Sequence, residues 1–425
     1  MDRRTLPHTD LTVSRFCFGT MTLGKPLDQA GTNAIIDRSL EAGINFFDTA
    51  NMYNAGVAET LLGTALKGRR DKIVLASKVF FKMGEEHDQH GLSRKAILRA
   101  IDESLSRLQT DYLDLYYLHA PDHTVPVEES LEAMESLVKQ GKVRYPACSN
   151  YAGWEVVQML WICKERGWRA PYVSQPMYNL MARGIEQEYL AMCKEFAVST
   201  IVYNPLAGGL LTGKHRQEVF IPGTRFDNNK LYQDRYWHTQ YFNSVERLRQ
   251  IAQSAGRSLI SLSLNWLLHH TVSDVVILGA SSLQQLNENL AAGEEGPLPE
   301  TSSRPAIRSG ATSAVPCRST TADARGFQTS NESVLIRVNP WLTSPAFPFR
   351  SPLVTFVLHP AHFARLSSCR PLQRFRGPSD KASVPDPRAQ RAERNCSLKF
   401  PKWHGEALRR CQNVPLTPTG RIGYV

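Results

Sequence analysis

Four side chains with complementary acid–base chemistry stand at or just beyond the ends of short apolar runs: Asp48, Tyr53, Lys78 and His119. A free phenol, with a pKa near ~10, is too weak an acid to protonate a developing alkoxide quickly at neutral pH. A buried ammonium beside the phenol would favour the phenolate and lower that pKa, and a carboxylate paired with the ammonium would keep the lysine charged. An imidazole could then orient a carbonyl oxygen by donating a hydrogen bond.

Together, these groups would form an acid that acts at a carbonyl carbon undergoing reduction or oxidation. The hydride for such a reaction has to come from a cofactor, because no side chain can supply one. Taken alone, each residue has a structural explanation: Lys78 as an ordinary strand-end lysine, His119 as a hydrogen-bonded structural histidine, Asp48 as the cap of a turn, Tyr53 as a loop aromatic. Their order at successive run ends favours the chemical interpretation.

The elements that would position these groups follow a regular alternation between about residue 14 and residue 290. Eight short apolar runs are separated by amphipathic stretches; the runs cover residues 14–18, 44–48, 73–78, 113–119, 143–149, 172–175, 200–203 and 275–278. Strands that alternate with helices imply right-handed βαβ units and a parallel sheet. Eight units in about 280 residues predict an α/β fold, the closed (β/α)8 TIM barrel. An open doubly wound sheet is the alternative, because periodicity does not show closure.

Helical periods are clearest in two of the intervening stretches. In residues 94–108 the aliphatic side chains fall on one face, with Ser93 where an N-cap belongs, and residues 128–138 repeat the pattern. Three tryptophans at seven-residue spacing are predicted to pack a further helix against the barrel: Trp154, Trp161 and Trp168.

Further polar and aromatic side chains close other apolar runs. In a barrel of this kind, chemistry gathers at the C-terminal ends of the strands, and those ends carry Ser149, Asn150, Gln175 and Tyr203. After Tyr203, about 40 residues rich in Gly, Pro, Lys and aromatics show no clear period. A loop of that length in a compact domain is usually functional or disordered.

The sequence around these residues resembles the aldo-keto reductases. The motifs around the four acid–base residues are Phe46-Phe47-Asp48-Thr49-Ala50 with Tyr53, Ala58-Glu59, Leu62-Gly63, Ala76-Ser77-Lys78-Val79 and Tyr117-Leu118-His119-Ala120-Pro121-Asp122. The resemblance continues through Gly141-Lys142-Val143-Arg144-Tyr145, Ser149-Asn150-Tyr151, Gln175-Pro176-Met177-Tyr178-Asn179 and Val276-Ile277-Leu278-Gly279-Ala280-Ser281-Ser282. It covers about residues 1–298. Within the family, the segment from Tyr203 to Lys214 looks most like the aflatoxin-aldehyde reductase branch, which reduces aldehydes and dicarbonyls with NADPH.

This resemblance implies a role for each of the four acid–base residues. Tyr53 would be the proton donor, Lys78 the cation that lowers its pKa, Asp48 the partner of Lys78, and His119 the group that orients the substrate carbonyl. The expected activity is the reduction of an aldehyde or ketone to an alcohol.

The resemblance also assigns residues to an NADP(H) cofactor. Ser149, Asn150 and Gln175 would hold the nicotinamide amide, Tyr203 would stack on the ring, and the Gly-rich segment after it would wrap the pyrophosphate. The cofactor residues as a set are Gly19, Thr20, Asp48, Ser149, Asn150, Gln175, Tyr203, Asn204, Pro205, Leu206, Gly208, Gly209, Lys214, Arg225, Gly279, Ser281, Ser282, Gln285 and Asn289.

The choice between NADP and NAD depends on the charge near the adenosine 2′-phosphate. Many family members place an Arg or Lys where this chain has the neutral Gln285. Lys214 and Arg225 are the nearest residues that could supply the charge, so NADP is favoured over NAD.

The last quarter of the chain departs from the family. Residues 301–425 hold 14 Pro, 14 Ser and 16 Arg, and 19 Lys and Arg against 6 Asp and Glu, a net charge of +13. Residues 1–300 therefore carry a net charge of −3, although the whole chain carries +10. We interpret residues 1–298 as an aldo-keto reductase barrel and residues 299–425 as a disordered tail, because such a composition buries too little surface to offset chain entropy. Binding of the basic tail to nucleic acid is the alternative to a solvated tail.

Composition and cysteine spacing limit the cellular compartment and the kinds of site that we expect. The chain is 42% hydrophobic, holds 8 Cys without a CxxC pair, and begins without an apolar leader. We therefore expect a reduced, cytoplasmic protein without a metal site or membrane segment, with a small-molecule carbonyl substrate. Nucleic acid is not an expected partner, and a homo-oligomer is left open. The alternative function is a cofactor-binding, redox-sensing regulatory subunit with little turnover, like the potassium-channel β subunits that share this fold.

Overall fold

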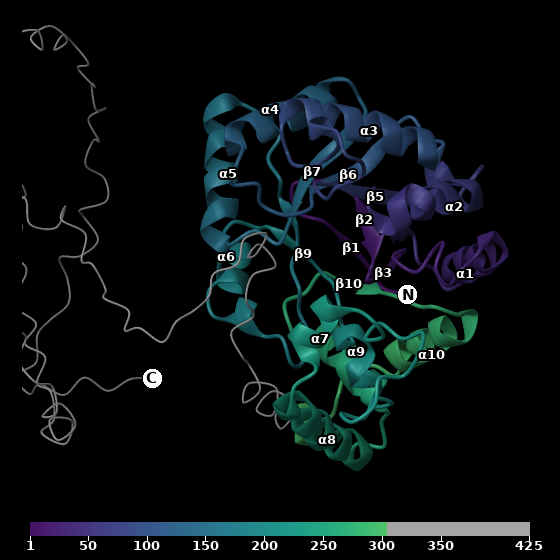
Figure 1. Cartoon of the computed structure of the whole chain (residues 1–425). Helices are drawn as coiled ribbons and strands as arrows, with labels where there is room; N and C mark the ends of the chain where they lie inside the picture. Colours follow the sequence, from purple (N-terminus) through teal and green to yellow (C-terminus); the bar gives the residue numbers. More distant parts are fainter. Residues whose placement is uncertain (304–425) are drawn as a thin grey trace, which may run out of the picture. The chain divides into compact units, whose positions relative to one another are not determined.

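Eight parallel strands close into a barrel in the computed structural model, which describes residues 1–303 (Figure 1). The strands are β3 (Phe16–Gly19), β4 (Phe46–Asp48), β5 (Val74–Val79), β6 (Leu113–Leu118), β7 (Val143–Ser149), β8 (Val173–Gln175), β9 (Ser199–Val202) and β10 (Val275–Leu278). Neighbours in sequence pair with one another, and β10 pairs with β3, where Ile277 lies opposite Cys17. The predicted (β/α)8 barrel is confirmed, and the open sheet is excluded.

Helices form the layer outside the strands (Figure 1). They are α1 (Gln29–Glu41), α2 (Val57–Ala65), α3 (Arg94–Leu108), α4 (Val127–Lys139), α5 (Gly153–Arg166), α6 (Tyr189–Glu195), α7 (Lys230–Tyr236), α8 (Thr239–Ser254), α9 (Leu259–His269) and α10 (Leu283–Glu294). The short 3-10 helices are η1 (Tyr53–Gly56), η2 (Arg70–Lys72), η3 (His87–Gln89), η4 (Gly184–Glu186) and η5 (Ala207–Thr212). The predicted N-cap of α3 is present, since the Ser93 side chain accepts a hydrogen bond from the backbone N–H of Ala96.

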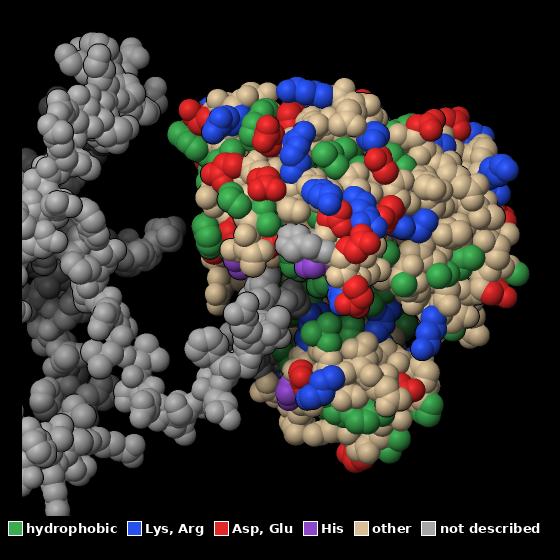
Figure 2. Space-filling view, turned by 45° about the horizontal axis from the view of Figure 1, so that its top comes forward, with side chains coloured by type: hydrophobic (Ala, Val, Ile, Leu, Met, Phe, Trp, Pro, Cys, Tyr) green, Lys and Arg blue, Asp and Glu red, His purple; other side chains and the backbone are tan. Residues whose placement is uncertain are grey.

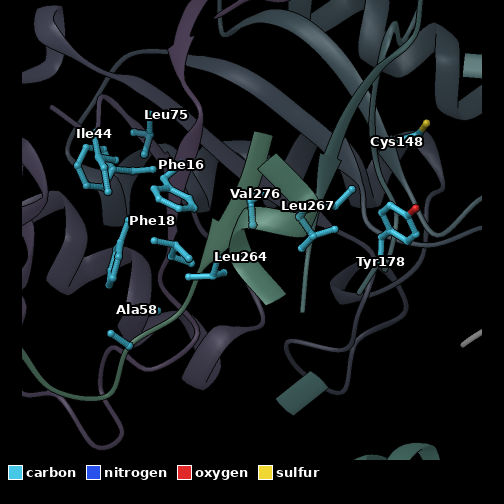
Figure 3. Close-up of a cluster of buried hydrophobic side chains, with 14 of the residues drawn as sticks. Phe16, Phe18, Ile44, Ala58, Leu75, Cys148, Tyr178, Leu264, Leu267 and Val276 are labelled. Atoms are coloured by element: carbon cyan, nitrogen blue, oxygen red, sulfur yellow. The ribbon is translucent and has the colours of Figure 1, made fainter. Parts of the chain in front are cut away.

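Two cores result from the period-2 alternation of the strands. The inner core fills the barrel and consists of Leu6, Leu11, Val13, Cys17, Phe46, Val74, Ala76, Leu115, Tyr117, Ala147, Val173, Ile201, Val275 and Ile277. The alternate strand residues point outward and pack under the helices; Phe16, Phe18, Leu75 and Val276 belong to this outer core (Figure 3). Strands buried on both faces explain why the sequence shows continuous apolar runs rather than alternation.

Sequence reasoning missed two features of the architecture. A hairpin of β1 (Arg3–Thr5) and β2 (Thr12–Ser14) precedes the barrel, and its apolar side chains Leu6, Leu11 and Val13 close the end of the barrel where the strands begin. The segment after Tyr203 without a clear period contains η5, α7 and the start of α8.

The prediction for the tryptophans is wrong at two of three positions. Trp154 is 65% exposed and Trp161 is 62% exposed, whereas Trp168 is partly buried against the core. Helix α5 buries Val156, Met159, Leu160 and Cys163 instead. These four residues occupy the helical stripe that faces the strands, so Trp154 and Trp161 fall on the opposite side.

Basic and acidic side chains are interspersed on the face of residues 1–303 shown in Figure 2. Within the described residues, every helix is too short or too polar to cross a membrane. The tail predicted to be disordered, residues 299–425, lies outside the described residues from residue 304 onward.

Candidate active site

The strand alternation places one layer of side chains at the mouth of the barrel. Each of these residues lies two positions after an inner-core residue of its strand, and therefore points to the same inner side. The layer consists of Gly19, Asp48, Lys78, His119, Ser149, Gln175, Tyr203 and Gly279. Six of the eight are polar or aromatic; of the two glycines, Gly19 ends β3 and Gly279 follows the last residue of β10, the strand that pairs with β3.

Lys78 is the centre of this layer. Its ammonium donates to Asp48 Oδ2 at 2.5 Å, to the Thr49 carbonyl at 2.7 Å and to the Tyr53 hydroxyl at 3.4 Å. The Lys78 side chain is fully buried, and that of Asp48 is nearly so. The structure thus brings together the carboxylate, the ammonium and the phenol predicted from the sequence.

The pKa values of Lys78 and Tyr53 reflect a balance between burial and charge. Burial acts to lower the pKa of Lys78, but Asp48 and Tyr53 act in the opposite direction and leave it above its ordinary value. Lys78 is therefore a cation at neutral pH. Burial raises the pKa of Tyr53 above its ordinary value, and the charge of Lys78 offsets only part of that effect. Lys78 thus acts on the pKa of Tyr53 in the expected direction, and desolvation of the phenolate opposes it.

His119 lies on the other side of Tyr53. The two rings meet edge to face with their centroids 6.1 Å apart, and the Phe81 ring also meets the imidazole edge to face, with centroids 4.9 Å apart. Burial, together with the charge of Lys78, lowers the pKa of His119 well below 6.5, so the imidazole is neutral. Within residues 1–303, its buried Nδ1 atom has no hydrogen-bond partner. A neutral imidazole with a free polar edge can donate to or accept from one ligand atom.

The residues predicted to hold a carboxamide form one connected network. Ser149 Oγ donates to the Gln175 carbonyl at 2.8 Å, and Asn150 Nδ2 donates to Ser149 Oγ at 3.0 Å. The Tyr203 hydroxyl donates to Asn150 Oδ1 at 2.8 Å. Gln175 also donates from Nε2 to Asp48 Oδ1 at 2.9 Å, which ties this network to the Lys78 centre. Asn150 holds a left-handed φ of 64°, which is uncommon for a residue with a side chain.

The Gly-rich segment after Tyr203 uses several of its N–H groups internally. Gly208 N donates to Asn204 Oδ1 at 2.7 Å, and Gly209 N donates to the Leu206 carbonyl at 2.9 Å. Gly208 and Gly209 have φ values of 69° and 103°, which favour glycine. Binding of a phosphate by these N–H groups would require their present hydrogen bonds to exchange.

The two residues predicted to supply positive charge, Lys214 and Arg225, differ in environment. Lys214 is exposed. The Arg225 guanidinium is partly buried, lies 5.3 Å from the centre of the Tyr232 ring, and contacts Met21 Sδ at 2.7 Å. Arg225 thereby links the segment after β9 to the loop after β3.

The predicted adenosine site gathers at the start of α10. Ser282 caps the helix by accepting from Gln285 N at 3.2 Å, and Gln285 Oε1 accepts from the backbone and the hydroxyl of Ser281. Asn289 donates to the Gly279 carbonyl at 3.3 Å. No described atom other than those of its chain neighbours lies within 4 Å of the place where a Cβ on Gly279 would stand, so Gly279 faces open space.

These groups fit a nicotinamide dinucleotide. A carboxamide needs both donors and acceptors, and the side chains of Ser149, Asn150 and Gln175 offer both. Sequence reasoning missed two contributors: the Thr49 carbonyl, which binds Lys78, and Met21, which contacts Arg225. The Thr49 contact is made by the backbone and has no signal in residue type.

Comparison with known proteins gives consistent matches over the described residues. The aldo/keto reductase family matches residues 15–304. Aflatoxin B1 aldehyde reductase member 2 from Homo sapiens is 39% identical over 298 residues, 66% of this chain and 82% of that protein. Aldo-keto reductase family 7 member A3 from Homo sapiens is 38% identical over 298 residues, 66% of this chain and 88% of that protein. A probable voltage-gated potassium channel subunit beta from Oryza sativa subsp. japonica is 33% identical over 305 residues, 70% of this chain and 93% of that protein.

Proposed function

Because the chain belongs to the aldo/keto reductase family, and is thus an oxidoreductase that acts on aldehydes or ketones, we propose that it is an NADPH-dependent reductase with Tyr53 as its general acid. The observation that carries this proposal is the buried ammonium of Lys78, which contacts both Asp48 and the Tyr53 hydroxyl. A structural role alone does not require a buried lysine to be held between a carboxylate and a phenol at the open end of a barrel.

Tyr53 is suited to deliver a proton to a carbonyl oxygen that gains negative charge. The phenol is protonated at neutral pH, and the charge of Lys78 makes it a stronger acid than burial alone would leave it. Lys78 stabilises the phenolate that forms as the proton leaves, and this help is greatest when the transfer is under way. Asp48 holds Lys78 in place and keeps it charged.

His119 positions the substrate oxygen. Being neutral, it can donate one hydrogen bond to a carbonyl without placing a second cation beside Lys78. Its edge-to-face contact with Tyr53 supports the action of both groups on one substrate oxygen.

Residues around the mouth would hold the cofactor. Ser149, Asn150 and Gln175 would bind the carboxamide, Tyr203 would pack on the ring, and Ser281, Gln285 and Asn289 would bind the adenosine end. When bound, the dihydronicotinamide supplies the hydride. Lys214 and Arg225 would supply positive charge for a 2′-phosphate, which supports NADPH over NADH.

The test is a binding titration of the full-length protein with NADPH and with NADH, followed by steady-state NADPH oxidation with a panel of aldehydes. Four relatives are named as aflatoxin B1 aldehyde reductases, so an aldehyde of aflatoxin B1 belongs in the panel. We expect tighter binding of NADPH and turnover of at least one aldehyde. Equal binding of both cofactors would contradict the NADPH assignment.

The second candidate is a cofactor-binding regulatory subunit with little turnover. The identity of 33% to a probable potassium channel subunit beta supports it. The same titration separates the two functions, since tight NADPH binding without turnover of any aldehyde would favour the regulatory function.

A further inference from the structure

The turn that carries Tyr53 has an unusual backbone. After Tyr53, Asn54 has φ 49° and ψ 43°, Ala55 has φ 54° and ψ 42°, and Gly56 has φ 89°. Three consecutive residues are therefore left-handed, and two of them carry a Cβ. Such a conformation costs free energy and persists only where the surrounding structure enforces it.

Two contacts enforce the turn. Asn54 Nδ2 donates to the Leu23 carbonyl at 2.5 Å and anchors one side. On the other side, Gly56 lies flat against the Arg107 side chain, since a Cβ on Gly56 would stand 2.8 Å from Arg107 Cδ and 2.9 Å from Nε. Arg107 belongs to α3, so a residue 51 positions further along the chain supports the turn of the general acid.

Arg107 is held in turn by the buried carboxylate of Glu59. Arg107 Nε donates to Glu59 Oε2 at 2.7 Å, and Ser77 Oγ donates to Glu59 Oε1 at 2.5 Å. The Glu59 side chain is fully buried, and Arg107 is 22% exposed. Ser77 immediately precedes Lys78 on β5. One carboxylate thus joins the helix after Tyr53, the arginine under its turn, and the strand of Lys78.

We propose that the ion pair of Glu59 and Arg107 is a positioning device that sets the Tyr53 hydroxyl against Lys78. Glu59 and Arg107 are positioning residues, because neither touches the reacting groups. The distance of 3.4 Å between Lys78 Nζ and the Tyr53 hydroxyl is near the limit of a hydrogen bond. A shift of the turn by a fraction of an ångström would therefore uncouple the two groups. The inference rests on the proposed role of Tyr53 as the acid.

The chain contains a matched control at the opposite end of the barrel. Arg70 Nη2 lies 2.8 Å from Asp114 Oδ2, and their side chains are 20% and 1% exposed, against 22% and 0% for Arg107 and Glu59. Replacing either arginine with methionine removes one cation from a buried carboxylate, although Asp114 keeps Arg144 as a second partner.

The experiment compares Arg107→Met, Arg107→Lys and Arg70→Met in the full chain, assayed well below the melting temperature of each variant. We expect Arg107→Met to lower kcat by about 10- to 100-fold with NADPH affinity within about twofold of wild type. The deuterium isotope effect on kcat should rise in this variant, and Arg107→Lys should restore part of the rate. Arg70→Met should lower the melting temperature by less, because Asp114 keeps its ion pair with Arg144, and should leave kcat unchanged. A kcat for Arg107→Met within about twofold of that for Arg70→Met would overturn the proposal.

A titration without cofactor separates this proposal from the proposed function. Ultraviolet difference spectra of Arg107→Met against Arg107→Met/Tyr53→Phe report the ionisation of Tyr53 alone. The charged and titratable groups that face Tyr53 are Lys78, Asp48, His119 and Tyr232. If Tyr53 loses contact with Lys78, its ionisation should occur at higher pH than in the corresponding difference between the wild-type protein and Tyr53→Phe. An unchanged titration would contradict positioning even if no aldehyde is turned over, whereas a shifted titration without turnover would contradict only the reductase function.

Where Arg107→Met does not fold, Ser77→Ala removes the hydrogen bond between Glu59 and β5 and leaves the ion pair intact, and the same two outcomes apply.

Discussion

The two ends of the barrel differ in how their buried polar groups are hydrogen-bonded. Where the strands begin, Asp114 is buried and accepts from Arg144 at 2.7 Å and from the Leu75 N–H at 2.9 Å, with Arg70 as a further ion-pair partner. Asn45 there bonds Ser14 and Thr12.

Where the strands end, buried polar atoms are left over. Within the part of the chain that the structure describes, Thr49 Oγ1, Asn51 Oδ1 and His119 Nδ1 have no hydrogen-bond partner, compared with Arg15 Nε and Ser199 Oγ at the end where the strands begin. Left-handed residues with side chains also gather there, among them Asn54, Ala55, Asn150, Asn204 and Ala207. Unsatisfied groups and backbone strain both cost stability. This difference supports the proposal that ligands bind where the strands end.

The largest expected effect is a loss of activity from a substitution at the mouth of the barrel. Tyr53→Phe should lower kcat by about 10³-fold, equivalent to about 4 kcal/mol, because the general acid is lost. NADPH affinity, measured by fluorescence titration, should stay within about twofold. The same substitution at the closed end, Tyr145→Phe, removes a hydroxyl that bonds Asp10 and should leave kcat unchanged. Turnover by Tyr53→Phe at the wild-type rate would remove the acid assignment.

Shortening a buried side chain of the β1–β2 hairpin should lower stability without changing activity at the mouth. Leu11 is 2% exposed and belongs to the inner core. Leu11→Ala should lower the free energy of unfolding by about 3 kcal/mol, since it leaves a cavity under the barrel. Urea denaturation measures this loss, and kcat at low denaturant should match wild type. A loss below about 1 kcal/mol would show that the hairpin does not close the core.

Removal of the buried carboxylate at the closed end should have a somewhat smaller effect. Asp114→Ala leaves the Leu75 N–H and two partly exposed arginines without their acceptor. We expect the free energy of unfolding to fall by about 2 kcal/mol. Urea denaturation and KM for the best aldehyde should be measured together, because a changed KM would mean that the two ends are coupled.

The smallest expected effect is the pH dependence at the mouth. The pKa of His119 lies well below its ordinary 6.5, so its charge does not change near neutrality. The pKa of Tyr53 lies above its ordinary 10, so reduction keeps its protonated acid until the pH rises beyond that value. We expect kcat for reduction to be flat between about pH 6 and about pH 9. A fall in kcat as the pH drops through about 6.5 would show that His119 takes up a proton there.

Much of the site could be predicted from the sequence because strand ends are visible in it. Apolar runs that end in Asp48, Lys78 and His119 indicate both a parallel barrel and its functional edge. The period-2 count that places Gln175 and Tyr203 in the same layer was also available in the sequence. It follows from the strands alone once their registers are known.

Other features depended on contacts between distant residues. The raised pKa of Tyr53 comes from burial, which the residue types around it do not show. The exposure of Trp154 and Trp161 depends on which face of α5 meets the strands. Helix α7 is short and lies in a segment without a clear period, so local pattern did not reveal it.

From the amino-acid order alone came the number of strand–helix units, the residues that end them, and the acid–base set that they carry. Those properties are local, because they depend on hydrophobic period and residue type. Closure of the barrel, the hairpin beneath it and the left-handed turn held by Arg107 and Glu59 came only from the tertiary structure. They are contacts between segments far apart in the chain, and no local pattern records which distant side chain will satisfy a buried group.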